Sequence, residues 1–284
     1  MGLFKRIFGG RKVTEESIDN GPSLEKSEKT NLAFVLLSKP HLPNAKTIVK
    51  AFREFADSGE KLIPLDEPSG QKAGEKAIIL DFNSGERSFV ALVPFAVPDG
   101  EAEHGVQFSL SGLKKNFQLQ PHHAHLIVSY NAEADSPPLV QLSRFTSLLA
   151  SVIKVAPAVG VYWANAGATH EAAFFTSIAK ASGISPRMMV WSGVSIAHEP
   201  DGRLSLLSLG MHQLDLPDLL LVAGKRSEGD ALPTLYDLLT YVAGRGKALP
   251  EGDTVGRSQK QRLPVRYVPS PIDPNVQVWR VELP

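Results

Sequence analysis

The chain has 284 residues, of which 43% are hydrophobic and 21% are charged, and its formal net charge is zero. This balance is typical of a folded globular protein, and without a net positive field it predicts no nucleic-acid partner. The sequence contains no cysteine. That excludes disulfides and thiolate chemistry and favours the cytoplasm. No apolar run reaches the roughly 20 residues that a membrane-spanning helix needs.

Residues 1–30 are predicted to be a flexible N-terminal segment, because from residue 9 onward they carry few large apolar side chains. Such a stretch cannot bury enough surface to offset its ordering entropy. The first eight residues differ, with four large apolar residues at helical spacing beside two basic ones: Leu3, Phe4, Ile7 and Phe8, with Lys5 and Arg6. A contact of residues 1–8 with a membrane surface or a partner is one interpretation. An unstructured start of the chain is the preferred one.

Residues 31–156 form the predicted first half, in the order strand, helix, three strands and helix. Its elements are a strand over residues 32–37, a helix capped by Asn44, a hairpin of strands 77–82 and 88–97, a strand over 125–130, and a helix opened by Ser136 and Pro137. Asparagine and serine are favoured helix caps, and proline is favoured at the first helical position. The stretch between the hairpin and the last strand is predicted to be mostly irregular.

Residues 157–284 form the predicted second half and repeat the same order. Its elements are a strand over residues 158–164, a helix capped by Thr169, a hairpin of strands 187–198 and 203–212, a strand over 219–222, a helix from Asp230, and two closing strands over 263–268 and 276–283. Strands and helices mixed at these spacings predict an α+β fold, with mixed or antiparallel sheets and helices on one face. The shared order predicts two ferredoxin-like pseudo-repeats, although the halves have almost no side-chain identity.

The most distinctive string is the turn Gly252-Asp253-Thr254-Val255-Gly256, which follows the amphipathic helix from Asp230. Over residues 230–284 this helix, turn and closing strand resemble the C-terminal signature of the bacterial family catalogued as domain of unknown function 4261. The resemblance implies no catalytic residues, because that family has no settled activity.

Two interpretations of this turn stay open. Glycines permit a positive φ or close backbone approach, and short polar side chains bond to local backbone N–H groups, so structural capping is the first. Contact with a ligand or partner is the second. The residues that would make it are Gly252, Asp253, Thr254, Gly256 and Arg257.

The strongest metal candidates are His123 and His125, which lie two residues apart at the start of a predicted strand. In an extended chain both side chains point to the same face, as two zinc ligands would. A third ligand has to come from elsewhere, for instance His104, Glu103 or His41. A polar strand entrance explains the same residues without a metal. The sequence therefore predicts no cofactor, and the two histidines stay candidates only.

No segment supplies a convergent nucleophile, base and metal set. This favours a non-catalytic cytoplasmic bacterial protein that binds another protein, as an accessory module of the kind found in immunity or secretion systems. The alternative is a small-ligand binder, or a hydrolytic or metal-dependent enzyme, with its site between the two halves. The residues that would then converge are His123, His125, Glu171 and Asp253.

Overall fold

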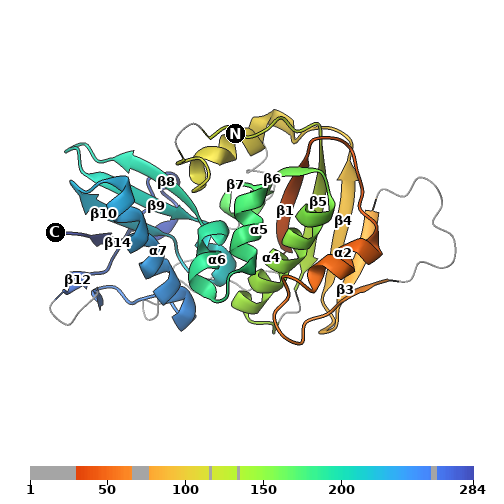
Figure 1. Ribbon diagram of the computed structural model, residues 1–284. Helices are drawn as coiled ribbons and strands as arrows, with labels where there is room; N and C mark the ends of the chain where they lie inside the picture. Colours follow the sequence, from red (N-terminus) through yellow and green to blue (C-terminus); the bar gives the residue numbers. More distant parts are fainter. Residues whose placement is uncertain (1–29, 66–76, 115–116, 133–134, 257–260) are drawn as a thin grey trace.

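The computed structural model describes residues 30–65, 77–114, 117–132, 135–256 and 261–284. Within these ranges the chain forms two large β-sheets at opposite ends of an elongated molecule, with helices packed on and between them (Figure 1). The predicted flexible segment lies outside the described residues except for Thr30, and so does the N-terminal apolar stretch.

In the described part of the chain the larger sheet has seven antiparallel strands in the order β2-β3-β4-β5-β1-β6-β7. They are β1 (Thr30–Leu37), β2 (Leu62–Pro64), β3 (Ala77–Phe82), β4 (Arg87–Val93), β5 (Ala124–Asn131), β6 (Ala158–Trp163) and β7 (Ala168–Glu171). Strand β1 is central and pairs with β5 on one side and β6 on the other. Because β6 and β7 belong to this sheet, it extends past residue 156, where the sequence placed the division between the halves.

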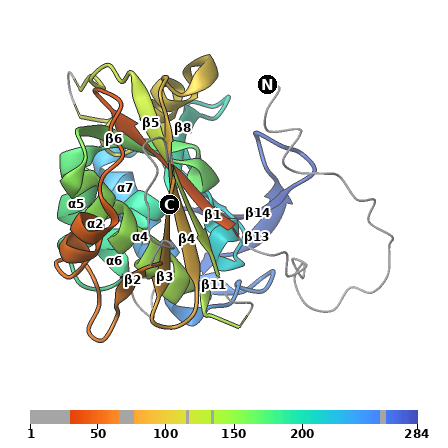
Figure 2. The same cartoon turned by 90° about the vertical axis from the view of Figure 1, so that its right-hand side faces the viewer.

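Three helices cover one face of this sheet, and Figure 2 shows them on the same side of β1 and β4. They are α2 (Ala45–Phe52), α4 (Pro138–Val155) and α5 (Ala172–Lys180). Alternate strand residues such as Val35 and Leu126 are fully buried beneath them. The predicted cap of α2 is confirmed, because Asn44 Oδ1 accepts a hydrogen bond from the Lys46 N–H at 2.8 Å.

A short segment covers part of the opposite face, over β6 and β7. It consists of the 3-10 turn η1 (Pro98–Gly100), helix α3 (Glu101–Gly105) and the 3-10 turn η2 (Val106–Phe108). The Thr169 hydroxyl donates to the Ala102 carbonyl at 2.6 Å, and Ala102 packs with Tyr162 in a small apolar cluster. Gly105 lies so close to the sheet that an added Cβ would sit 2.7 Å from the Thr169 hydroxyl oxygen. The close approach of this segment therefore requires glycine there.

The smaller sheet has five strands in the order β13-β14-β10-β9-β8. Its strands are β8 (Gly193–His198), β9 (Leu204–Leu209), β10 (Leu219–Gly224), β13 (Arg266–Pro269) and β14 (Gln277–Glu282). Beside it lie the helices α6 (Ile184–Trp191) and α7 (Glu228–Arg245) and the 3-10 turn η4 (Met211–Leu214). A separate two-stranded ribbon is formed by β11 (Thr254–Val255) and β12 (Leu263–Pro264). β10 and β14 run parallel while the other pairs are antiparallel. The predicted α+β class with mixed and antiparallel sheets is thus confirmed.

Three details of the prediction need correction. The two ferredoxin-like pseudo-repeats are not confirmed, because one continuous sheet takes strands from both predicted halves. Residues 187–191 belong to helix α6 rather than to a strand, since Met188 and Trp191 are buried at helical spacing. Thr169 lies inside strand β7 and does not cap α5. In each case tertiary burial outweighs the local pattern.

One buried ionic group ties α4 to two neighbouring loops. The Arg144 guanidinium donates to both carboxylate oxygens of Glu60, at 2.9–3.0 Å, and also to Glu86. Burial acts to raise the pKa of Glu86, but the Ser84 hydroxyl and the charge of Arg144 outweigh it, so this pKa lies below its usual range. Fork-shaped pairing of this kind fixes geometry as well as charge. It holds the β3–β4 turn and the chain after α2 against the helix.

The junction between the two sheets is filled by large side chains. The Trp163 indole on β6 donates to Gln213 Oε1 at 2.6 Å, and the Gln213 amide donates to the Trp191 and Gly210 carbonyls at 3.0 and 2.7 Å. The Trp191 indole donates in turn to the Thr146 hydroxyl on α4 at 2.7 Å. These polar groups are buried within one apolar cluster that takes residues from both sheets.

The change Gln213→Ala is expected to lower the free energy of unfolding by about 2–4 kcal/mol, because it leaves the Trp163 N–H and two carbonyls buried without partners. Denaturant unfolding of the variant and the unchanged protein measures this. The matched control is Gln118→Ala at an exposed glutamine, which should cost less than about 0.5 kcal/mol. Equal unfolding midpoints for the two variants would contradict the role given to the junction.

Candidate functional site

The Gly252–Gly256 turn is built into a small β-ribbon beside the five-stranded sheet. Gly252 has a φ of 80°, a left-handed value that favours glycine. Its N–H donates to the Val265 carbonyl at 2.9 Å, and the Val265 N–H donates to the Asp253 carbonyl at 2.8 Å. Asp253 Oδ1 accepts from the Thr254 N–H at 3.0 Å. The backbone and one polar side chain of the turn therefore serve the ribbon itself.

The end of the turn is equally constrained. An added Cβ at Gly256 would lie 1.8 Å from the Gln261 carbonyl oxygen, which no other residue can accommodate without backbone movement. Val255 is buried and pairs with Leu263 across the ribbon. Arg257 lies outside the described residues. The geometry supports the capping interpretation, while a ligand or partner contact of this turn stays a prediction.

The two candidate metal ligands differ sharply in environment. His123 is exposed, whereas His125 is buried at the start of β5 and its Nδ1 lies 2.9 Å from the Phe95 carbonyl oxygen, to which it donates. Burial lowers the pKa of His125, although this hydrogen bond partly opposes the shift. His125 also packs edge-to-face against Phe95. Its ring therefore fastens the chain after β4 to the sheet.

His122, which belongs to the same predicted histidine cluster but was not one of its two candidate ligands, is the histidine that meets a carboxylate. Its Nε2 accepts the Val97 N–H at 3.0 Å, so the proton of the neutral ring sits on Nδ1. Nδ1 lies 3.2 Å from Glu103 Oε1, outside hydrogen-bond geometry. Burial lowers the pKa of His122, and Glu103 only partly offsets it. Together His122 and His125 hold the segment that leads into α3.

The predicted set of converging residues is not brought together. Glu171 forms an ion pair with Lys114 at 2.9 Å and lies three strands from His125, about 14 Å at the usual strand spacing. Asp253 lies in the ribbon beside the other sheet. Within the described ranges, no three His, Asp or Glu side chains lie close enough together to hold a metal ion. No chemistry is therefore assigned to these residues.

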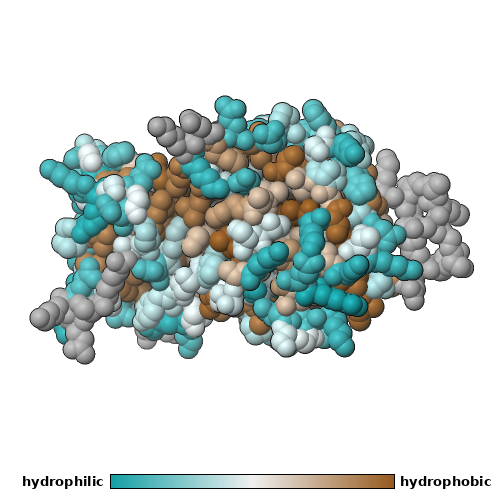
Figure 3. Space-filling model, in the orientation of Figure 1, coloured by the Kyte–Doolittle hydropathy of each residue, from teal (hydrophilic) through white to brown (hydrophobic). Residues whose placement is uncertain are grey.

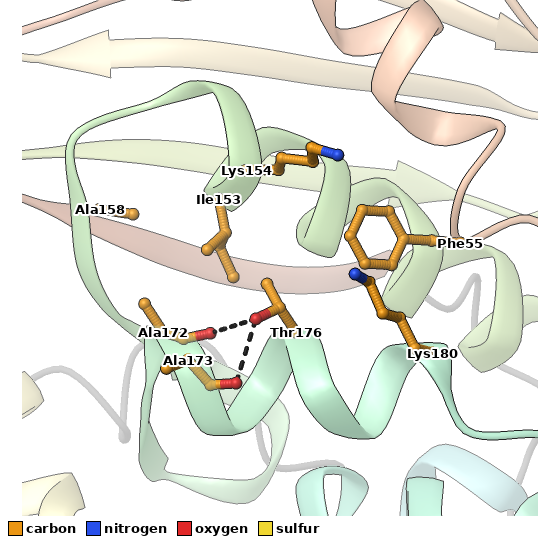
Figure 4. A pocket seen from close by; sticks show the side chains of 8 residues that line it. All are labelled: Phe55, Ile153, Lys154, Ala158, Ala172, Ala173, Thr176 and Lys180. Atoms are coloured by element: carbon orange, nitrogen blue, oxygen red, sulfur yellow. Dashed lines mark hydrogen bonds between the residues drawn. The ribbon is translucent and has the colours of Figure 1, made fainter.

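A shallow hollow of about 330 Å³ lies on the helix side, and Figure 4 shows its lining from α4, α5 and the chain after α2. Its polar groups are already engaged. Lys154 pairs with Glu54, and Lys180 lies 5.6 Å from the centre of the Phe55 ring. The Thr176 hydroxyl donates to its own helix at 3.0 Å. The hollow offers apolar alanine walls but no free set of convergent polar groups.

The surface of the helix side is mixed, with hydrophilic and hydrophobic residues interspersed over the helices (Figure 3). The opposite face of the seven-stranded sheet is different. Over β2, β3, β4, β5 and β1 its outward-facing positions are mostly apolar, and no helix of the described chain covers them. We call this surface the open sheet face. Phe34 also points to this side but packs against Val97 and Ala102. The exposed residues of the face are Ile63, Leu65 and Ile79, and its partly buried residues are Leu32, Phe89, Ala91 and Ile127.

Register places these side chains in two neighbouring rows, except Ile63, which lies opposite Asp81. Ile79 lies opposite Phe89, and Phe89 lies opposite Ser129, which is opposite Leu32. Ala91, Ile127 and Phe34 form the next row. Ile63 at the edge is 49% exposed and Ile79 is 38% exposed. Five strands at about 4.8 Å spacing make the face about 19 Å wide.

One end of the open sheet face is polar. Asp81 lies opposite Arg87, and the two side chains form a two-bonded ion pair at 2.7 and 2.9 Å. The Arg87 guanidinium holds the pKa of Asp81 below its usual range. In the next two strands Asn131 and Thr30 continue this row. An apolar centre with a polar rim is the usual anatomy of a protein interface.

The sequence carried a signal for this surface. In β3 and β4 both alternating positions are apolar, as in the neighbours Ile78 and Ile79 or Phe89 and Val90. An antiparallel strand with one solvated face normally alternates apolar and polar residues. Apolar residues on both faces indicate a sheet that is covered on both sides, and here only one side is covered by long helices.

Comparison with known proteins gives a family but no function. Residues 207–282 match the model of a family described as a domain of unknown function (DUF4261). The predicted resemblance to this family is confirmed over these residues, which run from β9 through α7 and the ribbon to β14. No curated protein and no solved structure matches the chain. In the parts of the chain that the structure describes, every helix is too short or too polar to cross a membrane.

The change Gly252→Ala is expected to lower the free energy of unfolding by about 1–2 kcal/mol, the usual cost of a left-handed conformation for a residue with a Cβ. Gly244→Ala is the matched control, because Gly244 lies inside α7 with open space around it. That change should raise stability by about 0.5–1 kcal/mol. Urea unfolding of both variants measures whether the free energy of unfolding falls for Gly252→Ala and rises for Gly244→Ala. A neutral Gly252→Ala would count against structural capping.

His170 makes stability depend on pH. It is fully buried on β7, its Nε2–H donates to the Val190 carbonyl at 3.1 Å, and burial lowers its pKa to about 4. Because the folded pKa lies below the ordinary histidine value of 6.5, the contribution of neutral His170 to stability is fully present above about pH 6.5 and is lost as pH falls toward 4. The full loss is about 3 kcal/mol at 1.36 kcal/mol per pKa unit.

The variant His170→Gln should lack this loss. The free energy of unfolding, measured by urea titration between pH 7 and pH 4, should therefore fall less steeply for the variant than for the unchanged protein. The control is His123→Gln at an exposed histidine, whose curve should run parallel to the unchanged protein. Parallel curves for His170→Gln as well would contradict the assignment.

Proposed function

We propose that this chain, whose residues 207–282 belong to a family without an assigned activity, is a non-catalytic protein that binds another protein through its open sheet face. The observation that carries the proposal is one sheet with apolar residues on both faces and long helices on only one of them. The lack of cysteine supports a reducing compartment such as the cytoplasm.

The size of the open sheet face supports a role in association. With a width of about 19 Å and strands about 17 Å long over five residues, it covers on the order of 300 Å² in projection. Exposed apolar patches of a few hundred square ångströms are often functional on a soluble protein. Burying this surface at about 25 cal/mol per Å² would contribute several kcal/mol to a complex.

The shape and charge of this surface favour a protein over a small molecule. Small-ligand sites are concave and contain a few convergent polar groups. The open sheet face is a sheet surface whose only charged pair, within the described chain, is Asp81 with Arg87 at one end. A partner with an amphipathic helix or an apolar sheet face complements it, just as α2 and α4 complement the other side.

The alternative function finds less support at its predicted location. The boundary between the predicted halves runs between α4 and α5, where the shallow hollow lies. The lysines of that hollow are engaged with Glu54 and with the Phe55 ring, and its lining does not include His123, Glu171 or Asp253. The junction between the two sheets is occupied by Trp163, Trp191 and Gln213, all buried and hydrogen-bonded. Protein binding is therefore the function that the geometry supports best.

The change Ile79→Lys is expected to reduce capture of the partner from a native lysate at least tenfold, because it places a charge among the exposed apolar residues of this face. Ile79 is already 38% exposed, so the fold should be kept. The control is Ile272→Lys, at a residue 65% exposed in the loop between β13 and β14. Capture is compared by quantitative mass spectrometry at equal bait. Equal recovery with both variants would reject this surface as the binding site.

A further inference from the structure

We infer that strand β8 pairs edge to edge with β8 of a second copy of this chain, antiparallel and about a two-fold axis at Ala197. The pairing joins the five-stranded sheets of the two copies into one continuous sheet. It uses a different sheet from the open sheet face, so it neither requires nor prevents binding of a partner there.

The outer edge of β8 carries backbone groups without a bonding partner in the described chain. In the hairpin with β9 the Glu199 N–H donates to the Arg203 carbonyl at 2.8 Å, and the Ala197 carbonyl accepts from a serine hydroxyl of β9 at 3.4 Å. In an antiparallel pair, successive residues alternate between bonding to the neighbouring strand and facing away from it. The N–H and C=O groups of Ile196 and His198 therefore point away from β9, and β8 is the last strand of its sheet.

The other three edges of the two large sheets are each protected. β2 has three residues and ends in Pro64. β7 packs against α3 and η2, and its Glu171 N–H donates to the Ser111 hydroxyl at 3.1 Å. On β13 the Tyr267 N–H donates to the Glu251 carboxylate. Proline, short strands and covering groups are the usual means of preventing edge-to-edge pairing.

β8 lacks these protections. Its six residues include no proline and none of the residues Lys, Arg, Asp and Glu. Ala197 and His198 are exposed, while Ser195 and Ile196 are half-buried. The β8–β9 hairpin lies at the end of the molecule away from β3 and β4 (Figure 1). An edge of this kind is a template for another strand.

The cover over the start of β8 sets the register of the pairing. Gly193 lies against η2, where the Phe108 carbonyl oxygen is 3.3 Å from the position of an added Cβ. The free part of the edge therefore runs from Ile196 to His198, and its centre is Ala197. With Ala197 on the axis, Ile196 of each copy lies opposite His198 of the other and exchanges N–H···O=C bonds with it in both directions. Such a two-fold pair is closed and does not grow into a filament.

The side chains and charges at this edge favour a second copy over a foreign strand. The central pair takes the position where Cα atoms are about 4.5 Å apart, which suits a residue as small as Ala197. β8 has no charged side chain that would select a foreign partner, and Arg203 on the next strand is paired with Asp201 and Glu282 of its own chain. Like charges are therefore not placed opposite each other along β8.

The size of the contact predicts a weak dimer. A standard protein interface covers about 800 Å² on each partner, and the edge of one short strand covers much less. The dimer should therefore form at high protein concentration and dissociate on dilution.

Sedimentation equilibrium of the purified full-length protein over about a hundredfold range of concentration measures this association. The average mass of the unchanged protein should rise from one chain toward two. His198→Pro should stay near one chain throughout, because proline removes an N–H that points away from β9 and leaves the hairpin bonds in place. The matched control is His198→Thr, which removes the same exposed side chain, keeps the N–H and should associate as the unchanged protein does.

Single cysteines locate the contact, since the unchanged chain has none. Where the unchanged protein is dimeric, Ala197→Cys should form an intermolecular disulfide at least about tenfold faster than Ile272→Cys, because only the first brings two Cα atoms within disulfide range. Ile272 is 65% exposed and lies in the loop between β13 and β14. Should His198→Pro unfold, Ala197→Lys replaces it, because it places two like charges at the axis and should also keep the protein monomeric.

A monomer at every concentration, association that the folded edge variant leaves unchanged, or equal disulfide rates for the two cysteines would overturn the inference. None of these measurements uses a lysate or a partner, so the effect of Ile79→Lys on partner capture is tested separately.

Discussion

The structure depends on the way two tryptophans and one glutamine close the junction between its sheets. Trp163 comes from the seven-stranded sheet, Trp191 from the helix that leads to the other sheet, and Gln213 bonds to both while Thr146 receives the second indole. Each bond satisfies a group that is buried in the apolar core, where an unpaired donor costs about 1–3 kcal/mol. The two sheets are therefore parts of one packed body, and large buried side chains fill the junction between them.

The seven-stranded sheet is asymmetric because α2, α4 and α5 all pack on one of its faces. The face toward these helices holds the core, and the ionic group around Arg144 fixes α4 to the loops at one end. Among the described residues, α3 and its neighbouring turns cover part of the other face, and His122 and His125 fasten the chain that leads there. The strands beyond that cover keep apolar side chains in neighbouring rows. This arrangement puts the open sheet face next to a segment held by a few specific hydrogen bonds.

Much of the fold was predictable from sequence because local signals and burial agree. Asn44 caps its helix as expected, and the Glu199–Gly202 turn closes the predicted hairpin between β8 and β9. The wrong predictions concern residues for which the local sequence pattern and the burial in the structure disagree. Residues 187–191 contain apolar residues that fit a strand or a helix, and packing against α5 and α7 selects the helix. The pairing of β1 with β6 joins the predicted halves into one sheet, and no local pattern encodes which distant strands become neighbours.

The candidate sites also show that residue type and spacing alone do not predict the surroundings of a side chain. The sequence drew attention to the glycines of the Gly252–Gly256 turn, and the backbone geometry explains Gly252 and Gly256 without a ligand. His123 and His125 share a spacing that suits a metal, but one is in solvent and the other holds the Phe95 carbonyl. The open sheet face was missed because it consists of apolar residues such as Ile79 and Phe89. In the sequence alone, such residues in a strand predict burial in the core. Only the sheet order shows that nothing in the described chain lies over them. For this chain, apolar positions that the described helices leave uncovered are therefore a better guide to function than the type of any single residue.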